Sequence, residues 1–256
     1  MKALVKLGGT LLDAPESRAR LAAELAAAAG GGLDLVVVHG GGKQMTRFLA
    51  ERGVESRFVN GLRVTTPETI DAVLKVFAGS VNHELVAALI AAGAAAVGLT
   101  GIDACLVEAE PLDAALGAVG KPVRANPALL ELLTANRFLP VVACVAGDAC
   151  GRIYNVNADQ MAVACAAAFG ADLLVFLTDV PGVLGPAHEL LPRLTAAECR
   201  SLIERGIATG GMQAKLNAAT NALENGVGQV VIAPGAEPGI FARLVAGEIA
   251  GTTLVS

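Results

Sequence analysis

The sequence predicts an α/β protein, a three-layer αβα sandwich built around one mostly parallel central sheet. Short apolar runs alternate with amphipathic or Ala-rich segments along the 256 residues, the order that a parallel sheet covered by helices on both faces requires. Residues 33–38 are apolar except for Asp34, and the run ends at His39, as expected for a strand buried on both faces. Glycines, of which there are 30, cluster after the apolar runs and indicate turns from strand to helix.

In the first half of the chain, the expected helices begin at recognisable signals. Pro15 lies near the first position of an Ala-rich helix that ends at residues 30–32, which are all glycine. Thr66-Pro67-Glu68 opens a helix, and a separate helix follows Asn82. The expected elements are strands at residues 3–7, 33–39, 95–99 and 140–145, helices at 15–30, 42–52, 66–77, 82–92 and 127–136, a hairpin at 58–65 turning at Asn60-Gly61, and an irregular hairpin region at 105–124.

The second half repeats the alternation. Thr195 and Glu198 form a T-x-x-E capping box at the start of a helix. The expected elements are strands at residues 173–177, 229–233 and 252–255, and helices at 157–169, 195–205, 211–224 and 239–245. No linker is rich in Pro, Ser or charge, so one sheet should be continuous through two lobes, residues 1–170 and 171–256.

Composition excludes several classes of protein. A net charge of −5 argues against binding to nucleic acid or to an acidic membrane surface. The five cysteines form no C-x-x-C pair, which is typical of reduced thiols in a cytoplasmic protein. Residues 85–102 carry no charge, but this run is mostly Ala and Gly and divides at Gly93 into a helix-like and a strand-like half, so we expect no membrane span and no signal peptide.

Three expected strand ends carry unusual residues, in segments 6–10 (KLGGT), 39–43 (HGGGK) and 155–159 (NVNAD). Ligands of parallel sheets bind at the carboxyl ends of strands. Glycines between a strand and a helix let backbone N–H groups approach an anion, and the helix N-terminus adds partial positive charge. Neither the Walker A loop nor the G-x-G-x-x-G dinucleotide fingerprint is present.

Lys6 is the most informative residue, because a buried ammonium group must be paired or functional. Lys215 lies in the early turns of a helix that begins at Gly210-Gly211. Two lysines and glycine amides around one anion suit phosphoryl transfer, and Asp159 could hold both ammonium groups in place. The alternatives are that Lys6 reaches the surface from its strand end and that Asp159 only caps a helix.

The motifs K-x-G-G, H-G-G-G, G-L-R-V-T, V-N-A-D and G-G-M-x-x-K occur in this order over nearly the whole chain. As an ordered set they resemble the amino-acid kinase superfamily, and within it the N-acetylglutamate kinase family most closely. The resemblance implies the amino-acid kinase fold, with acyl-amino-acid binding and dimerisation in residues 1–170 and ATP binding in residues 171–256.

The resemblance also implies roles for individual residues. Lys6 and Lys215 would stabilise the transferring phosphoryl group, and Asp159 would orient them. The substrate-binding residues would be Gly41, Gly42, Arg63 and Asn155, with Arg63 clamping a carboxylate, and the residues of the nucleotide and phosphate half would be Gly8, Gly9, Gly40, Thr178, Asp179, Gly210 and Gly211. ATP would carry Mg²⁺ on its β- and γ-phosphates, so no protein metal ligand is assigned.

The implied reaction converts ATP and N-acetyl-L-glutamate to ADP and N-acetyl-L-glutamyl 5-phosphate, the second step of arginine biosynthesis. A carboxylate is already ionised at pH 7 and needs no general base, so we expect His39 to be structural. A kinase of N-succinylglutamate or of an acylated 2-aminoadipate remains an alternative, although G-L-R-V-T at residues 61–65 favours acetylglutamate. A non-catalytic nucleotide sensor would not need Lys6, Asp159 and Lys215 together.

The expected partners are small-molecule substrates and a second copy of the chain. The helices between residues 66 and 92 offer an Ala-rich surface that could pair by symmetry, and the resemblance implies a homodimer. In that family, arginine-inhibited members carry an extra N-terminal helix. Because the first strand starts by Ala3, we expect no feedback by arginine.

Overall fold

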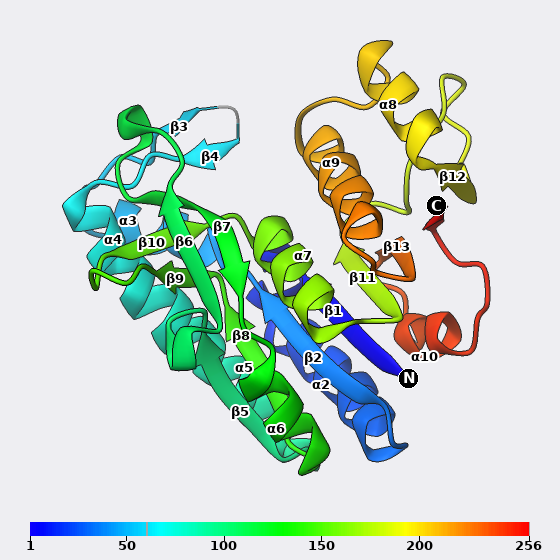
Figure 1. Cartoon of the computed structure of the whole chain (residues 1–256), viewed down its shortest axis with the longest axis horizontal. Helices are drawn as coiled ribbons and strands as arrows, with labels where there is room; N and C mark the ends of the chain where they lie inside the picture. Colours follow the sequence, from blue (N-terminus) through cyan, green and yellow to red (C-terminus); the bar gives the residue numbers. More distant parts are fainter. Residues whose placement is uncertain (60, 256) are drawn as a thin grey trace.

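The structure, a computed structural model, describes residues 1–59 and 61–255, and one eight-stranded sheet forms its centre (Figure 1). The strand order is β12-β14-β13-β11-β1-β2-β8-β5. The strands of this sheet are β1 (Lys2–Leu7), β2 (Asp34–His39), β5 (Ala96–Thr100), β8 (Leu139–Ala143), β11 (Leu173–Thr178), β12 (Arg193–Thr195), β13 (Gln229–Pro234) and β14 (Thr252–Val255). All neighbours pair in parallel except β13 and β14, which confirms the mostly parallel sheet.

Helices cover both faces of the sheet, as the three-layer prediction requires. In Figure 1, α7 crosses the near face beside α6 and α9, whereas α2 and α5 pack together on the other face, where α10 contacts α2. The helices are α1 (Gly9–Asp13), α2 (Pro15–Gly30), α3 (Gly42–Ala50), α4 (Pro67–Val73), α5 (Asn82–Ala91), α6 (Ala128–Ala135), α7 (Ala158–Phe169), α8 (Ala196–Glu204), α9 (Gly210–Glu224) and α10 (Ile240–Val245). Short 3₁₀ turns lie at η2 (Asp103–Cys105) and η3 (Ala114–Leu116).

The carboxyl ends of the three central strands lie side by side. Leu7 of β1 pairs with His39 of β2 on one side and with Leu177 of β11 on the other. Each of these strands is almost completely buried, because its side chains meet helices on both faces. The residues that follow the three strands therefore gather at one edge of the sheet, the carboxyl edge, where the sequence predicts that ligands bind.

A second, smaller sheet was only partly expected. Strands β6 (Val107–Pro111), β7 (Val119–Ala125), β9 (Val145–Gly147) and β10 (Ile153–Val156) close into a four-stranded barrel. The antiparallel pairing of β6 with β7 confirms the hairpin expected at residues 105–124. The expectation that residues 155–159 follow a strand of the main sheet is wrong, because β10 belongs to this barrel. Its pairing with β7 joins segments far apart in the chain, which local sequence patterns do not reveal.

The expectation of two separate helices after residue 66 is wrong. Residues Pro67–Ala91 form one 25-residue helix, in which a π-helical segment, η1 (Leu74–Val81), joins α4 to α5. Asn82 does not start a new helix, because its side chain is buried and donates to the ring of His39 and to the carbonyl oxygen of Val141. By length and composition this helix is also able to span a membrane, but here Leu85 and Leu89 are buried in the core.

Three smaller features complete the comparison with the expected elements. The hairpin at residues 58–65 is confirmed by the pairing of β3 (Phe58–Val59) with β4 (Leu62–Arg63), while Asn60 of its turn lies outside the described residues. The short helix α1 and the edge strand β12 were not expected, because neither contains enough residues to show a periodic pattern.

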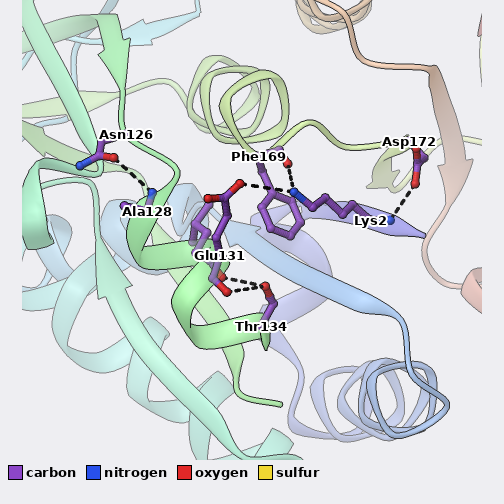
Figure 2. Close-up of polar contacts among 8 residues, drawn as sticks. Lys2, Asn126, Ala128, Glu131, Thr134, Phe169 and Asp172 are labelled. Carbon is purple, nitrogen blue, oxygen red and sulfur yellow. Dashed lines mark hydrogen bonds and ion pairs between the residues drawn. The ribbon is translucent and has the colours of Figure 1, made fainter. Parts of the chain in front are cut away.

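At the opposite edge of the sheet, Lys2 ties three elements together (Figure 2). Its Nζ donates to the carbonyl oxygen of Phe169 at the end of α7 (2.9 Å), lies 4.7 Å from the centre of the Phe169 ring and is 3.4 Å from Glu131 Oε1 of α6. Its backbone N–H donates to Asp172 Oδ2 (2.8 Å). A cation at a helix C-terminus is favourable, so Lys2 holds the far end of α7, the helix that carries Asp159 at its start.

Candidate active site

Asp159 lies between the two lysines that the sequence singled out. Lys6 Nζ is 2.7 Å from Asp159 Oδ1, and Lys215 Nζ donates to Asp159 Oδ2 at 3.1 Å. The three side chains come from three elements: Lys6 from the end of β1, Asp159 from the first turn of α7 and Lys215 from the second turn of α9. Lys6 is 8% exposed and Asp159 5%, so these charges are removed from water and balanced mainly by one another.

The structure contradicts the two alternatives for Lys6 and Asp159, a surface lysine and a helix cap. Lys6 does not reach the surface, since it is buried against Asp159. Asp159 does not cap α7 either, because Asn157 is the N-cap and its Oδ1 accepts from the backbone N–H groups of Asp159 and Gln160. The cap at Asn157 leaves the Asp159 carboxylate free for the lysines.

The lysines keep Asp159 ionised. Burial by itself would raise the pKa of this carboxyl, but attraction to Lys6 and then to Lys215, with hydrogen bonds from both, holds the pKa below its ordinary value. Two ammonium groups and one carboxylate leave one net positive charge at the centre. This charge faces a cavity of about 910 Å³ lined by Lys6, Asp159, Lys215, Gly210 and Gly211, together with residues of β7, α7 and α9.

Helix α9 opens directly into this cavity. No side chain caps its N-terminus, so the first-turn N–H groups remain available to an anion. A Cβ placed on Gly210 or on Gly211 would meet no atom within 4 Å, which shows that the space beside both glycines is open. Gly210 also has φ +54°, a conformation that favours glycine.

The two glycine loops after β1 and β2 meet each other. A Cβ on Gly9 would lie 3.1 Å from the backbone nitrogen of Gly42. These glycines are the first residues of α1 and α3, and neither helix has a side-chain N-cap. The backbone N–H groups of two helix starts are therefore close together just beyond the ends of β1 and β2, an arrangement that suits an anionic group.

The other three glycines of these loops differ in how closely neighbouring atoms approach them. A Cβ on Gly41 would lie 2.8 Å from the ring of Phe77 in η1, so the π-helical segment requires glycine at this position. A Cβ on Gly40 would meet Ala158 at 3.3 Å, and one on Gly8 would meet a carbonyl oxygen at 3.4 Å. Close packing thus accounts for the glycine at position 41, whereas the contact at position 40 is only tight and that at position 8 is ordinary.

Arg63 lies in a second cavity, of about 590 Å³, together with Gly9 and Gly42. Its side chain is 7% exposed, and its partners in the described part of the chain are neutral. Nη2 donates to the carbonyl oxygen of Gly42 (3.1 Å) and to Thr46 Oγ1 (2.8 Å), Nη1 donates to Ser56 Oγ, and the guanidinium lies 4.6 Å from the centre of the Phe58 ring. Burial lowers the pKa of Arg63, yet a guanidinium stays charged at pH 7.

Asn155 is joined to the same hairpin but lines neither cavity. Its Nδ2 donates to Thr65 Oγ1 (3.0 Å), and Thr65 Oγ1 donates to the carbonyl oxygen of Arg63 (2.9 Å). Asn155 thereby links β10 of the barrel to the strand that carries Arg63. The sequence did not indicate this connection.

Thr178 is the last residue of β11, and Asp179 follows it at the same edge of the sheet. Thr178 is buried and its hydroxyl donates to Asp179 Oδ1 (3.1 Å). Neither residue lines the two cavities that contain the lysines and Arg63. Their position at the end of a central strand agrees with a ligand site, and Thr178 also pairs with Pro234 of β13 and accepts from the backbone N–H of Gly235 (2.8 Å).

His39 is held as a neutral structural residue. It is fully buried, Nδ1 lies 2.9 Å from the carbonyl oxygen of Gly40, and Nε2 lies 2.9 Å from Asn82 Nδ2. Since the amide nitrogen must donate to Nε2, the ring proton is on Nδ1 and points to Gly40. Burial lowers the pKa of His39 to about 4, opposed by the hydrogen bond to Gly40. The ring therefore supports the glycine loop and is unavailable as a base.

Sequence reasoning missed the residues that surround the main groups. Thr46, Ser56 and Phe58 contact Arg63, and Asn82 fixes His39. Cys144 is buried near Lys6, and burial raises the pKa of its thiol to about 12, partly offset by the charge of Lys6. The only available signal was that Thr46 comes four residues after Gly42, on the same side of α3.

Comparisons with known proteins agree with this geometry. Residues 1–234 match the amino acid kinase family. The acetylglutamate kinase of Solibacter usitatus is 68% identical over 256 residues, which cover all of both chains. The structure of N-acetylglutamate synthase from Neisseria gonorrhoeae, complexed with coenzyme A and N-acetyl-glutamate, has a TM-score of 0.89 and 26% identity, and it covers 100% of this chain and 59% of that one. Carbamate kinase from Giardia lamblia shares the fold at a TM-score of 0.74 and 18% identity, covering 100% of this chain and 98% of that one.

Proposed function

Because the chain belongs to the amino acid kinase family, and within it to the acetylglutamate kinases, we propose that it transfers the γ-phosphoryl group of ATP to the side-chain carboxylate of N-acetyl-L-glutamate. The product is N-acetyl-L-glutamyl 5-phosphate, and the reaction is the second step of arginine biosynthesis. The observation that carries this proposal is the buried Lys6–Asp159–Lys215 centre, whose net positive charge faces a cavity at the carboxyl edge of the sheet.

In this mechanism an oxygen of the acceptor carboxylate attacks the γ-phosphorus while the bond to the β-phosphate breaks and ADP leaves. No proton has to move, because the carboxylate is already ionised, and the neutral, buried His39 agrees with this. Lys6 and Lys215 stabilise the charge on the transferring group, and Asp159 keeps both ammonium groups aimed at it. Uncapped N–H groups at Gly9, Gly42 and Gly210 add to that stabilisation.

Arg63 is proposed to bind the other carboxylate of the acceptor. A buried guanidinium surrounded by neutral oxygens lacks a counter-ion, and an anionic ligand in the 590 Å³ cavity supplies one. Asn155, Gly41 and Gly42 are proposed to complete the acceptor side, and Gly8, Gly9, Gly40, Thr178, Asp179 and the Gly210-Gly211 turn to complete the nucleotide side. Their support is their position within the last residues of β10 and β11, after β1, β2 and β11, or at the start of α9.

ATP is the phosphoryl donor of this kinase family, and we propose that Mg²⁺ accompanies it. Within the described residues, no three His, Cys, Asp or Glu side chains gather in a way that could hold a metal ion, and Asp159 is already paired with two lysines. In this proposal the phosphates of ATP and water molecules would hold the ion, as Mg²⁺ keeps several of its waters. The ion would neutralise phosphate charge that the lysines do not reach.

The proposal is tested by ADP release from the purified chain with four acceptors: N-acetyl-L-glutamate, N-succinyl-L-glutamate, N-acetyl-2-aminoadipate and L-aspartate. We expect the highest kcat/KM with N-acetyl-L-glutamate. A higher value with the succinyl or aminoadipate compound would move the function to a related kinase. The absence of acceptor-dependent ADP release would favour a nucleotide sensor and overturn the proposal.

We further propose a homodimer in the cytoplasm. The long helix Pro67–Ala91 exposes Ile90 (56%) beside β5, the edge strand of the sheet, so an apolar surface lies next to an unpaired edge. All five cysteines are free, which agrees with a reducing compartment.

Sedimentation tests the proposed dimer. It should show a dimer that Ile90→Glu dissociates, and a wild-type monomer would contradict this. The expected insensitivity to arginine stays a prediction.

A further inference from the structure

Three hydrogen bonds join Thr46, Arg63 and the carbonyl group of Gly42. Arg63 Nη2 donates to Thr46 Oγ1 (2.8 Å) and to the carbonyl oxygen of Gly42 (3.1 Å), and Thr46 Oγ1 donates to that same carbonyl (2.9 Å). A hydroxyl has one proton. Since that proton points to Gly42, a lone pair of Oγ1 faces the guanidinium and accepts from it.

This contact joins the hairpin to the body of the protein. Arg63 is on β4, one of two strands of two residues each, and its other side-chain partners, Ser56 and Phe58, come from the same hairpin region. Thr46 and Gly42 belong to α3, which begins at the edge of the main sheet. The Thr46 side chain and the Gly42 backbone carbonyl are therefore the contacts that fix the guanidinium relative to the glycine loop.

The chemical nature of the contact also matters. A carboxylate at position 46 would neutralise Arg63, whereas a hydroxyl accepts a hydrogen bond and leaves the full positive charge. The same hydroxyl donates to the carbonyl oxygen of Gly42. Gly42 is the first residue of α3, and its backbone nitrogen lies beside Gly9. Position and charge of the guanidinium are thus set together by one neutral side chain.

We propose that Thr46 is a positioning residue for the acceptor: it fixes Arg63 beside the start of α3 and so sets where the acceptor's carboxylate binds relative to the glycine loops. This inference rests on the proposed function, in which Arg63 binds that carboxylate. Thr46 itself lines the cavity of Arg63 and is exposed to it.

The test compares Thr46→Val, which keeps the shape and removes the hydroxyl, with Thr46→Ser, which keeps the hydroxyl. Loss of one hydrogen bond to a charged group should raise the KM for N-acetyl-L-glutamate about tenfold. Because the lost interaction acts on binding and not on the reacting oxygen, kcat and the KM for ATP should change by less than about twofold. Thr46→Ser should restore the wild-type KM.

Thr134→Val is the matched control. Thr134 makes the same bond four residues back, from Oγ1 to the carbonyl oxygen of Leu130 (2.8 Å), in α6 at the far edge of the sheet (Figure 2). Thr134 is buried, so its loss should cost at least as much stability as that of Thr46, with all three kinetic constants unchanged. If Thr46→Val does not fold, Thr46→Ala, a better helix former, carries the same prediction.

Three results would overturn the role of Thr46: an unchanged acceptor KM in Thr46→Val, a Thr46→Ser variant as impaired as Thr46→Val, or an equal rise in the KM for ATP. The wild-type chain separates this outcome from failure of the proposed function. A wild-type chain that phosphorylates N-acetyl-L-glutamate while Thr46→Val keeps its KM refutes the positioning role alone. A wild-type chain that phosphorylates no carboxylate refutes both.

Discussion

Replacing Asp159 by Asn changes one charge at the centre of the site while keeping the size of the side chain. In the wild type, the carboxylate oxygens lie 2.7 Å from Lys6 Nζ and 3.1 Å from Lys215 Nζ. At an effective dielectric constant of about 20, a unit-charge pair at about 3 Å attracts by roughly 5 kcal/mol. Much of this offsets the cost of removing the charges from water, so loss of one partner should lower the free energy of unfolding by about 3 kcal/mol.

The kinetic effect should be separable from the loss of stability. Without the carboxylate, the two ammonium groups repel each other and lose their orientation, so kcat should fall by at least about 10²-fold, as for removal of one preorganised group from a transition state. The assay is ADP release at saturating substrates, divided by the folded fraction from urea denaturation. Asp172→Asn is the control, because Asp172 binds the backbone of Lys2 at the opposite edge of the sheet. A folded Asp159→Asn variant with near wild-type kcat would refute the reasoning.

Three further predictions address other parts of the structure. Arg63→Lys keeps the charge but loses the two-pronged donor, so the KM for N-acetyl-L-glutamate should rise about tenfold in steady-state assays while that for ATP stays constant; a rise for ATP alone would place Arg63 with the nucleotide. His39 has a folded-state pKa of about 4, below its ordinary 6.5, so its contribution to stability is present above pH 6.5 and is lost as the pH falls toward 4. From pH 7 to pH 5 this group should lower the free energy of unfolding by about 2 kcal/mol, and a His39→Gln variant that keeps the full pH dependence in urea denaturation would contradict this. Lys2→Met removes a cation from the end of α7 and from the face of Phe169, so thermal denaturation should show a loss of about 1 kcal/mol with kcat unchanged; a large loss of kcat would give Lys2 a role beyond stability.

The sequence predicted the central strands and the grouping of Lys6 with Asp159 and Lys215 for physical reasons that are visible in single residues. β1, β2 and β11 are mostly apolar on both faces, and short apolar runs that end at glycines are typical of strands buried on both sides. Lys6 interrupts such a strand, and a buried ammonium group requires an anion, which the structure supplies as Asp159. Charge in an apolar setting is a strong signal even without a structure.

Features that depend on long-range packing could not be predicted in the same way. Asn82 resembles a helix start in sequence, but its amide turns inward to His39 and Val141, and the helix continues through a π-helical segment. The barrel strand β10 is four residues long and pairs in parallel with β7, far away in the chain. Thr46 carries no charge and is an ordinary residue of α3 until the hairpin brings Arg63 against it.

The central claim is that the chain transfers a phosphoryl group to a carboxylate oxygen, and trapping the product with hydroxylamine tests it most directly. An acyl phosphate reacts with hydroxylamine to give a hydroxamate, which is measured by its iron complex alongside ADP. We predict one hydroxamate for each ADP, formed only when ATP and N-acetyl-L-glutamate are both present. ADP released without hydroxamate would show that the phosphoryl group goes to water or to another acceptor, and it would contradict the account.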